Sequence, residues 1–90
     1  MQLIIEMAPY NDSELEAFAR WLQPSLQRKI RWSWQIDFPH PRLVSDRMPE
    51  ATAAQLFRAM KQKATDTYGS GVKYPESSRF YVEDYAVRMA

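Results

Sequence analysis

The most regular pattern of hydrophobic and polar positions in the chain runs from Lys29 to Phe38. Every second position in this segment carries a large apolar side chain: Ile30, Trp32, Trp34, Ile36 and Phe38. The positions between them are polar or charged. Such strict alternation is typical of a β-strand with one buried face and one face in water. We therefore expect both tryptophans to lie in the core and Pro39 to end the strand.

Three other segments predict strands. Residues 2–8 alternate in the same way and end at Pro9, since proline cannot donate to a ladder. Residues 42–44 either form a short return strand or stay unpaired. Residues 79–89 are interpreted as one last strand, and a switch in the alternation near Asp84 predicts a β-bulge there.

A first helix is predicted after Asn11, whose side chain can cap it by accepting a hydrogen bond from the amide of Ser13 or Glu14. Apolar residues then follow at helical spacing: Leu15, Phe18, Leu22 and Leu26. Pro24 interrupts this pattern, because proline lacks an amide donor and clashes with the preceding turn. The helix is therefore expected either to kink at Pro24 or to stop at Leu22 and restart as a short turn through Arg28.

A second helix is predicted to begin after a cap at Asp46 or Met48, with Pro49 in its first turn. Its apolar stripe comprises Ala53, Leu56, Phe57, Met60, Ala64 and Tyr68. Gly69 is expected to end the helix, because glycine adopts the positive φ of many helix ends. The segment 69–78 that follows contains two glycines, a proline and three serines, which predicts a flexible connection.

The order of these elements predicts a single α+β domain spanning residues 1–90. Strand, helix, strand, short strand, helix and strand follow one another, which is the split βαββαβ order called ferredoxin-like. Two helices, each with one apolar stripe, would then pack on one face of a small, mainly antiparallel sheet. If residues 42–44 do not pair, the alternative is a three-stranded sheet with two helices.

Composition excludes several classes of function. The chain of 90 residues has no Cys and one His, and its 12 Lys and Arg nearly balance its 11 Asp and Glu. The lack of Cys excludes a disulfide scaffold, a thiolate zinc site and a cysteine nucleophile. A single His excludes a metal site with two histidines in one chain. The balanced charge creates no overall field that would attract nucleic acid or an anionic membrane.

The sequence contains no convincing catalytic, cofactor or metal motif. His40 lies between two prolines without a catalytic partner motif and is interpreted as a solvated loop residue. The segment 69–73 resembles a phosphate-binding loop, but it follows a helix and lacks the Gly-Lys-Ser/Thr ending. Glu83 and Asp84 are neighbours in a predicted strand, so they would point to opposite faces. We expect neither an enzyme nor a bound metal or cofactor.

The chain is expected to be cytoplasmic. The apolar run near its start is only three residues long and lacks a basic region before it, which argues against a signal peptide. No segment reaches the roughly 18 consecutive apolar residues that a membrane-spanning helix needs.

The leading hypothesis is a small, non-enzymatic protein-binding module that acts as an adaptor or a stoichiometric inhibitor. Phages and mobile elements carry accessory inhibitors of this description. Trp, Tyr, Met and Arg are plentiful, and protein interfaces are enriched in these residue types. Their positions at element edges, on the polar sheet face or in the predicted loop make four residues candidates for partner contacts: Trp21, Arg31, Tyr74 and Tyr81.

Two other hypotheses remain open. The first is single-stranded nucleic-acid binding through the exposed sheet face, since aromatic residues on an open sheet can stack bases. Arg31, Arg79, Tyr81 and Tyr85 would form that surface. The second is a homodimer formed through the strand 29–38, because a long strand at a sheet edge is a template for pairing with a second copy.

Overall fold

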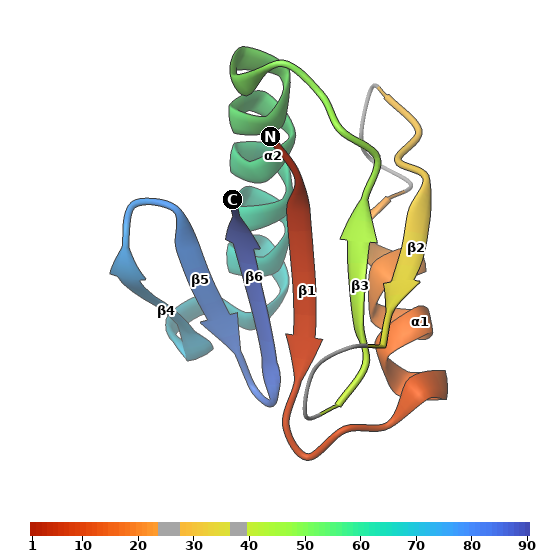
Figure 1. Cartoon of the computed structure of the whole chain (residues 1–90). Coiled ribbons are helices and arrows are strands. Elements are labelled where there is room, and N and C mark those ends of the chain that lie inside the picture. The colour runs from red at the N-terminus through yellow and green to blue at the C-terminus, as the bar shows by residue number, and fades with distance from the viewer. Residues whose placement is uncertain (24–27, 37–39) are drawn as a thin grey trace.

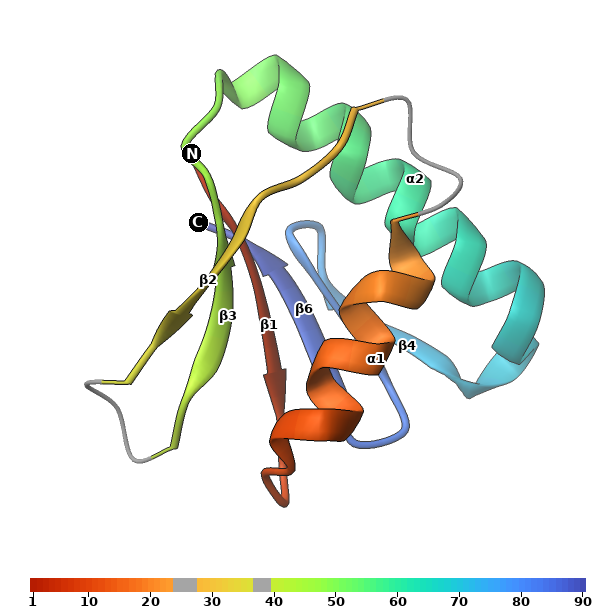
Figure 2. The same ribbon diagram turned by 90° about the vertical axis from the view of Figure 1, so that its right-hand side faces the viewer.

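The computed structural model describes residues 1–23, 28–36 and 40–90. These residues form two α-helices, a short 3-10 helix and six strands: β1 (Leu3–Met7), α1 (Asp12–Leu22), β2 (Trp32–Gln35), β3 (Arg42–Ser45), α2 (Glu50–Tyr68), η1 (Gly69–Gly71), β4 (Val72–Glu76), β5 (Arg79–Val82) and β6 (Tyr85–Met89). The strands form one sheet in the order β2-β3-β1-β6-β5-β4, and each neighbouring pair is antiparallel. Both helices cover the same face of this sheet (Figures 1 and 2).

The α+β class is therefore confirmed, but the ferredoxin-like strand order is not matched. Two segments account for the additional strands. Residues 79–89 form a hairpin of β5 and β6 in place of one bulged strand, because Glu83 and Asp84 make a two-residue turn in which Glu83 has a φ of 51°. The segment expected to be a flexible connection contains η1 and β4, which pairs with β5 at the sheet edge. Residues 42–44 do pair, within β3.

The core lies between the helices and the sheet. Its largest fully buried side chains come from β1, both helices, β5 and β6: Leu3, Ile5, Leu15, Leu22, Met60, Phe80, Val82 and Val87. The predicted stripe of α2 is buried from Ala53 to Ala64, while Tyr68 is half-buried. Among the described residues, neither helix combines the length and apolar character needed to cross a membrane.

The helix ends agree only partly with the sequence patterns. Asn11 caps α1 by accepting a hydrogen bond from the Glu14 amide at 3.1 Å, as predicted, and α1 ends at Leu22. The expected restart after Pro24 lies mostly outside the described residues. The cap predicted at Asp46 or Met48 is wrong, because α2 starts at Glu50 with Pro49 in the capping position and no side-chain capping bond.

Asp46 has a different role, which explains why it is not a cap. Its carboxylate accepts a hydrogen bond from Arg28 Nη2 at 2.6 Å and another from the Arg31 amide at 3.1 Å. The Asp46 amide donates to the Arg31 carbonyl at 2.9 Å. Asp46 therefore fixes the chain that enters β2 against the end of β3.

The prediction that the strand 29–38 buries its whole apolar face is wrong. β2 covers only Trp32–Gln35 and lies at the edge of the sheet, where α1 covers it incompletely. Trp34 pairs with buried Leu43 and thus lies on the helix side, yet it is 37% exposed, and Ile36 is 70% exposed. Ile30 is buried, and Phe38 lies outside the described residues. Alternation along a strand identifies its two faces but not its place in the sheet.

Candidate functional site: the open face of the sheet

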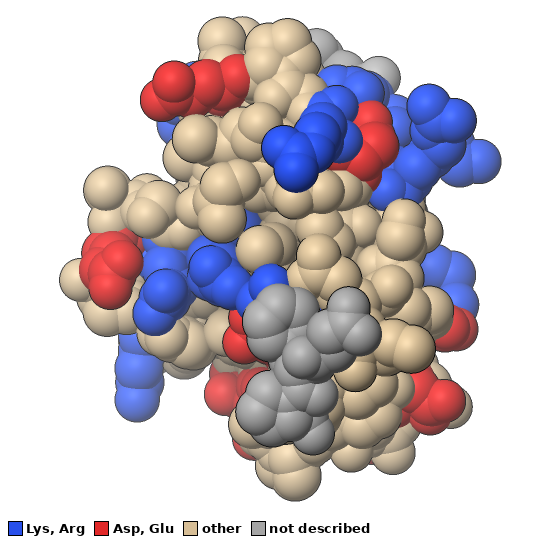
Figure 3. All heavy atoms as spheres, viewed as in Figure 1, with Lys and Arg blue, Asp and Glu red and all other residues tan. Residues whose placement is uncertain are grey.

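The sheet face opposite the helices carries a group of charged residues from three neighbouring strands. In the antiparallel register Glu6 of β1 lies beside Ala86 of β6, which lies beside Tyr81 of β5. Arg88 of β6 and Arg79 of β5 are likewise directly opposed. Because residues two apart in a strand share a face, these four polar side chains lie together on the open face. Figure 3 shows basic side chains gathered on this side of the molecule over β5 and β6.

Glu6 is the central carboxylate of this face. Its Oε1 atom accepts hydrogen bonds from Arg42 Nη1 at 3.2 Å and from Arg88 Nη2 at 3.2 Å and Nε at 3.4 Å. The Arg42 Nε atom also donates to Gln35 Oε1 at 2.9 Å. The side chains of Arg42, Arg88 and Glu6 are 14%, 27% and 32% exposed, so these contacts are partly shielded from water. Glu6 therefore binds two arginines, one from β3 and one from β6, and its single negative charge is shared between them.

Arg79 is less well compensated than Arg88. Its Nη1 atom donates to the Tyr81 hydroxyl at 3.3 Å, and its ion pair with Glu76 is 4.0 Å long. The Arg79 Nε atom is buried and has no hydrogen-bond partner among the described residues. The hydrogen bond to Tyr81, followed by the charges of Tyr81 and Glu76, raises the pKa of Arg79 above its ordinary value. Arg79 stays charged and retains capacity to donate to an anion.

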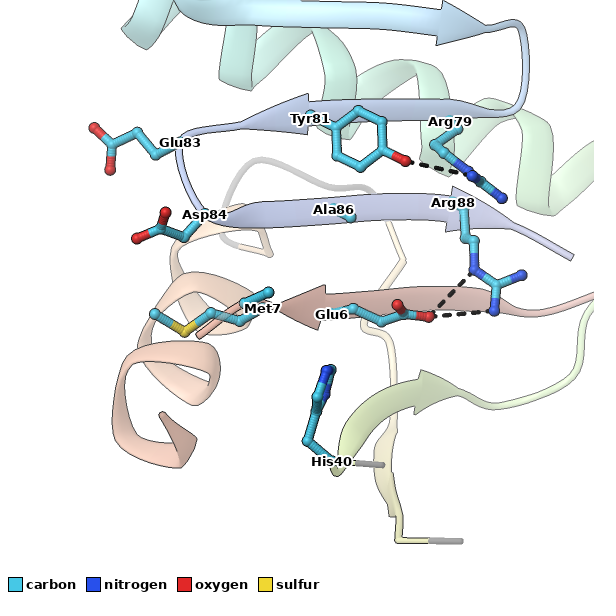
Figure 4. A pocket seen from close by; sticks show the side chains of 10 residues that line it. Glu6, Met7, His40, Arg79, Tyr81, Glu83, Asp84, Ala86 and Arg88 are labelled. Atoms are coloured by element: carbon cyan, nitrogen blue, oxygen red, sulfur yellow. Dashed lines mark hydrogen bonds and ion pairs between the residues drawn. The ribbon is translucent and has the colours of Figure 1, made fainter. Parts of the chain in front are cut away.

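A groove of about 550 Å³ runs along this face. Its polar lining comprises Arg79, Arg88, Glu6, Glu83, Asp84, Tyr81 and His40. Figure 4 shows the two arginines at one end, the two acidic residues of the hairpin turn at the other, and Tyr81 between them. A cavity of this volume is in the range that holds a small ligand or a short peptide segment. The groove is thus polarised, with positive charge at one end and negative charge at the other.

His40 forms the side of the groove next to β1. It is half-buried, and its ring stacks on Tyr10 with 6.2 Å between the ring centroids. Its Nδ1 atom is buried without a hydrogen-bond partner among the described residues. The prediction that His40 is a solvated loop residue is therefore wrong, because its ring is half-buried and its Nδ1 atom is buried. Tyr10 also makes an edge contact with Trp34, so an aromatic cluster links the groove to the edge strand β2.

Of the four predicted contact residues, the structure places only Tyr81 in the groove. Trp21 packs between the helices, with its ring centroid 5.8 Å from those of Phe18 and Tyr68 and Lys63 Nζ 4.9 Å from its centre. Trp21 is therefore partly buried and packs against the helices, on the side of the sheet opposite the groove.

Arg31 and Tyr74 lie in two further places. Arg31 is exposed where the chain enters β2, and its backbone is bound by Asp46. Tyr74 of β4 is 44% exposed, with its hydroxyl bonded to Thr65 and Lys61 Nζ 4.3 Å from its ring centre. Tyr85, suggested for nucleic-acid stacking, instead stacks on Phe18 of α1 at 3.9 Å and belongs to the helix side.

Sequence reasoning did not find the cluster around Glu6 and Arg88. The signal was present in the alternation of Arg79 and Tyr81 with buried Phe80, and of Arg88 with buried Val87. This signal predicts the cluster only when Glu83 and Asp84 are recognised as a hairpin turn, because the turn sets which residues of β5 and β6 share a face.

Comparisons with protein-family models, with characterised proteins and with solved structures gave no match to this chain. Among the described residues, no group of three or more His, Asp or Glu side chains is arranged to hold a metal ion.

Proposed function

We propose that the chain is a non-enzymatic protein-binding module, an adaptor or a stoichiometric inhibitor, that binds its partner through the open face of the sheet. The observation that carries this proposal is the groove lined by Arg79, Arg88 and Tyr81 on a face that neither helix covers. Arginine and tyrosine are the residue types that most often anchor protein interfaces. The groove combines them with carboxylates, which gives the charge complementarity that selects a partner.

The same face gives some support to a second candidate function, binding of single-stranded nucleic acid. Two arginines beside a tyrosine on an open sheet can contact a phosphate and stack a base. The three carboxylates of the groove, Glu6, Glu83 and Asp84, oppose this, because they repel a phosphate backbone that follows the groove. Protein is therefore the favoured partner.

The position of β2 at the edge of the sheet supports self-association by strand pairing. An edge strand offers unpaired backbone groups to another strand. Trp34 in β2 and Ile36 just after it are both exposed. A homodimer through this edge is the corresponding proposal for self-association. The oligomeric state, measured by sedimentation over a range of concentrations, tests it separately from the open face.

Affinity capture with the tagged full chain tests the proposed function. We expect wild type to retain a protein partner in a fixed ratio after nuclease treatment, and the double variant R79A/Y81A to lose it. K29A and R58A change exposed cations outside the groove and should retain the partner. Circular dichroism confirms that each variant is folded. Undiminished capture by R79A/Y81A would contradict binding through this face, and capture that nuclease abolishes would favour nucleic acid.

A further inference from the structure

The arginine end of the groove holds two like-charged side chains, Arg79 and Arg88. Arg79 and Arg88 are directly opposed across the β5–β6 ladder, and opposed like charges destabilise a sheet unless an anion compensates them. Glu6 compensates Arg88 but is shared with Arg42. Arg79 keeps a buried Nε donor that no described residue uses. A carboxylate can accept from two guanidinium groups at once, so it fits between this pair.

The opposite end of the groove has the reverse charge. Glu83 and Asp84 form the turn between β5 and β6, and both are exposed. Neither forms an ion pair with a described residue of the chain. Figure 4 shows both side chains at the far end of the groove from the arginines. An ammonium or guanidinium group would be attracted to this end.

The length of β5 is comparable to that of a short extended peptide. β5 is extended from Arg79 to Val82, which at about 3.3 Å per residue spans about 10 Å, and the acidic turn begins at the next residue, Glu83. In an extended segment, side chains four residues apart point the same way and are about 13 Å apart, which is enough to reach from Arg79 to the turn. Tyr81 lies halfway along the groove and can pack against the residue between the two charges.

We infer that the groove binds an extended segment of the partner that carries a carboxylate and, four residues away, a cationic side chain. The carboxylate lies between Arg79 and Arg88, and the cation lies beside Glu83 and Asp84. This inference rests on the proposed function and specifies the chemistry of the partner. A segment with two acidic residues is disfavoured, because its second carboxylate would meet those of the turn.

The first test uses the peptide acetyl-Glu-Thr-Val-Thr-Lys-amide as a probe of the full chain. Titration at millimolar concentrations is followed by the NMR shifts of the β5 and β6 amides, with the indole signal of Trp21 as a remote reference. Two control peptides replace the Glu or the Lys by Gln, and a third has Glu at both ends. We expect each control to bind about tenfold more weakly, since each loses a charge-assisted contact.

Variants of the protein assign each charge to its end of the groove. R79Q should remove the preference for the peptide carboxylate, and the double variant E83Q/D84N should remove the preference for the lysine. R58Q is the matched control, since Arg58 is an exposed residue of α2 outside the groove. Equal binding of the four peptides by wild type would overturn the inference. So would a preference that R79Q and E83Q/D84N leave unchanged.

Failure of this inference is distinguishable from failure of the proposed function. If no peptide shifts the β5 and β6 amides while R79A/Y81A still abolishes partner capture, the segment chemistry is wrong and the binding face is right. If oligothymidylate shifts these amides and the peptides do not, both proposals are overturned in favour of nucleic-acid binding.

Discussion

Arg79 and Arg88 face each other across the β5–β6 ladder, but their charges are compensated unequally. Arg88 is held by Glu6 at 3.2 Å, whereas the ion pair of Arg79 with exposed Glu76 is 4.0 Å long. Glu6 therefore limits the repulsion within a basic cluster drawn from β3, β5 and β6. This asymmetry makes Glu6 important for stability and leaves Arg79 as the cation most able to bind a ligand.

Replacing Glu6 by Gln should destabilise the fold. The variant keeps the side-chain shape but removes the negative charge that Arg42 and Arg88 share. We expect the free energy of unfolding to fall by about 1–2 kcal/mol, the usual range for hydrogen bonds to partly shielded charged groups. Urea unfolding measures the change, and E83Q is the control on the exposed turn. Equal stability of E6Q and E83Q would mean that Glu6 does not organise this face.

Truncation of an aromatic residue should destabilise the fold much more in the core than on the edge strand β2. Phe80 is fully buried against Phe57, with ring centroids 5.5 Å apart, whereas Trp34 is 37% exposed on the edge strand. F80A should therefore cost about 3–5 kcal/mol, and W34A clearly less. Denaturant unfolding of both variants gives the comparison. A larger loss for W34A would place the edge strand, rather than the β5–β6 hairpin, in the main core.

Local sequence signals predicted the parts of the fold that depend on local chemistry. The cap at Asn11, the buried stripe of α2 and the positive φ of Gly69 all follow from residues within one or two turns. The end of α1 at Leu22 is one of the two alternatives that Pro24 allows. Strand order depends on pairing between segments that are far apart in the sequence, and no local pattern contains that information. Trp34 shows the consequence, since its alternation correctly indicated a strand but not an edge strand.

The candidate site could be predicted even less well, for a related physical reason. Glu6 and Arg88 are separated by 82 residues and meet only because β1 pairs with β6. A tight turn at Glu83 and Asp84 lacks the glycine or asparagine that usually marks a two-residue hairpin. Without that signal, residues 79–89 are predicted to form one strand, which wrongly places Tyr85 on the exposed face together with Arg79 and Tyr81.

Gly69 should be sensitive to substitution because of its backbone conformation rather than its surroundings. It ends α2 with φ 57° and ψ −124°, a region that residues with a side chain rarely adopt, although an added Cβ would meet no atom within 4 Å. G69A should cost about 1–3 kcal/mol. G71A is the matched control, because its Cβ would make an ordinary 3.8 Å contact with Tyr68 and its φ is not positive. Similar unfolding midpoints for the two variants would contradict this account.

Tyr85 should make the fold sensitive to alkaline pH. Burial, with a further contribution from the carboxylate of Glu14, raises the pKa of its hydroxyl above the ordinary value of 10.0. Because the pKa is then higher in the folded chain than in the unfolded chain, the stabilising effect of the neutral phenol is complete below pH 10 and is lost as the pH rises through the folded value.

The variant Y85F tests this linkage while keeping the ring that stacks on Phe18 at 3.9 Å. Above pH 10 the free energy of unfolding should fall less steeply with pH in Y85F than in wild type. Near neutral pH the difference in free energy between the two proteins should not change with pH. All other ionisable groups are the same in both proteins, so their effects cancel in the comparison. Tyr10, whose pKa is raised by burial and by Asp12, accounts for part of the slope that remains in Y85F. Parallel curves for the two proteins throughout the alkaline range would show that the Tyr85 hydroxyl ionises as easily in the folded chain as in the unfolded one.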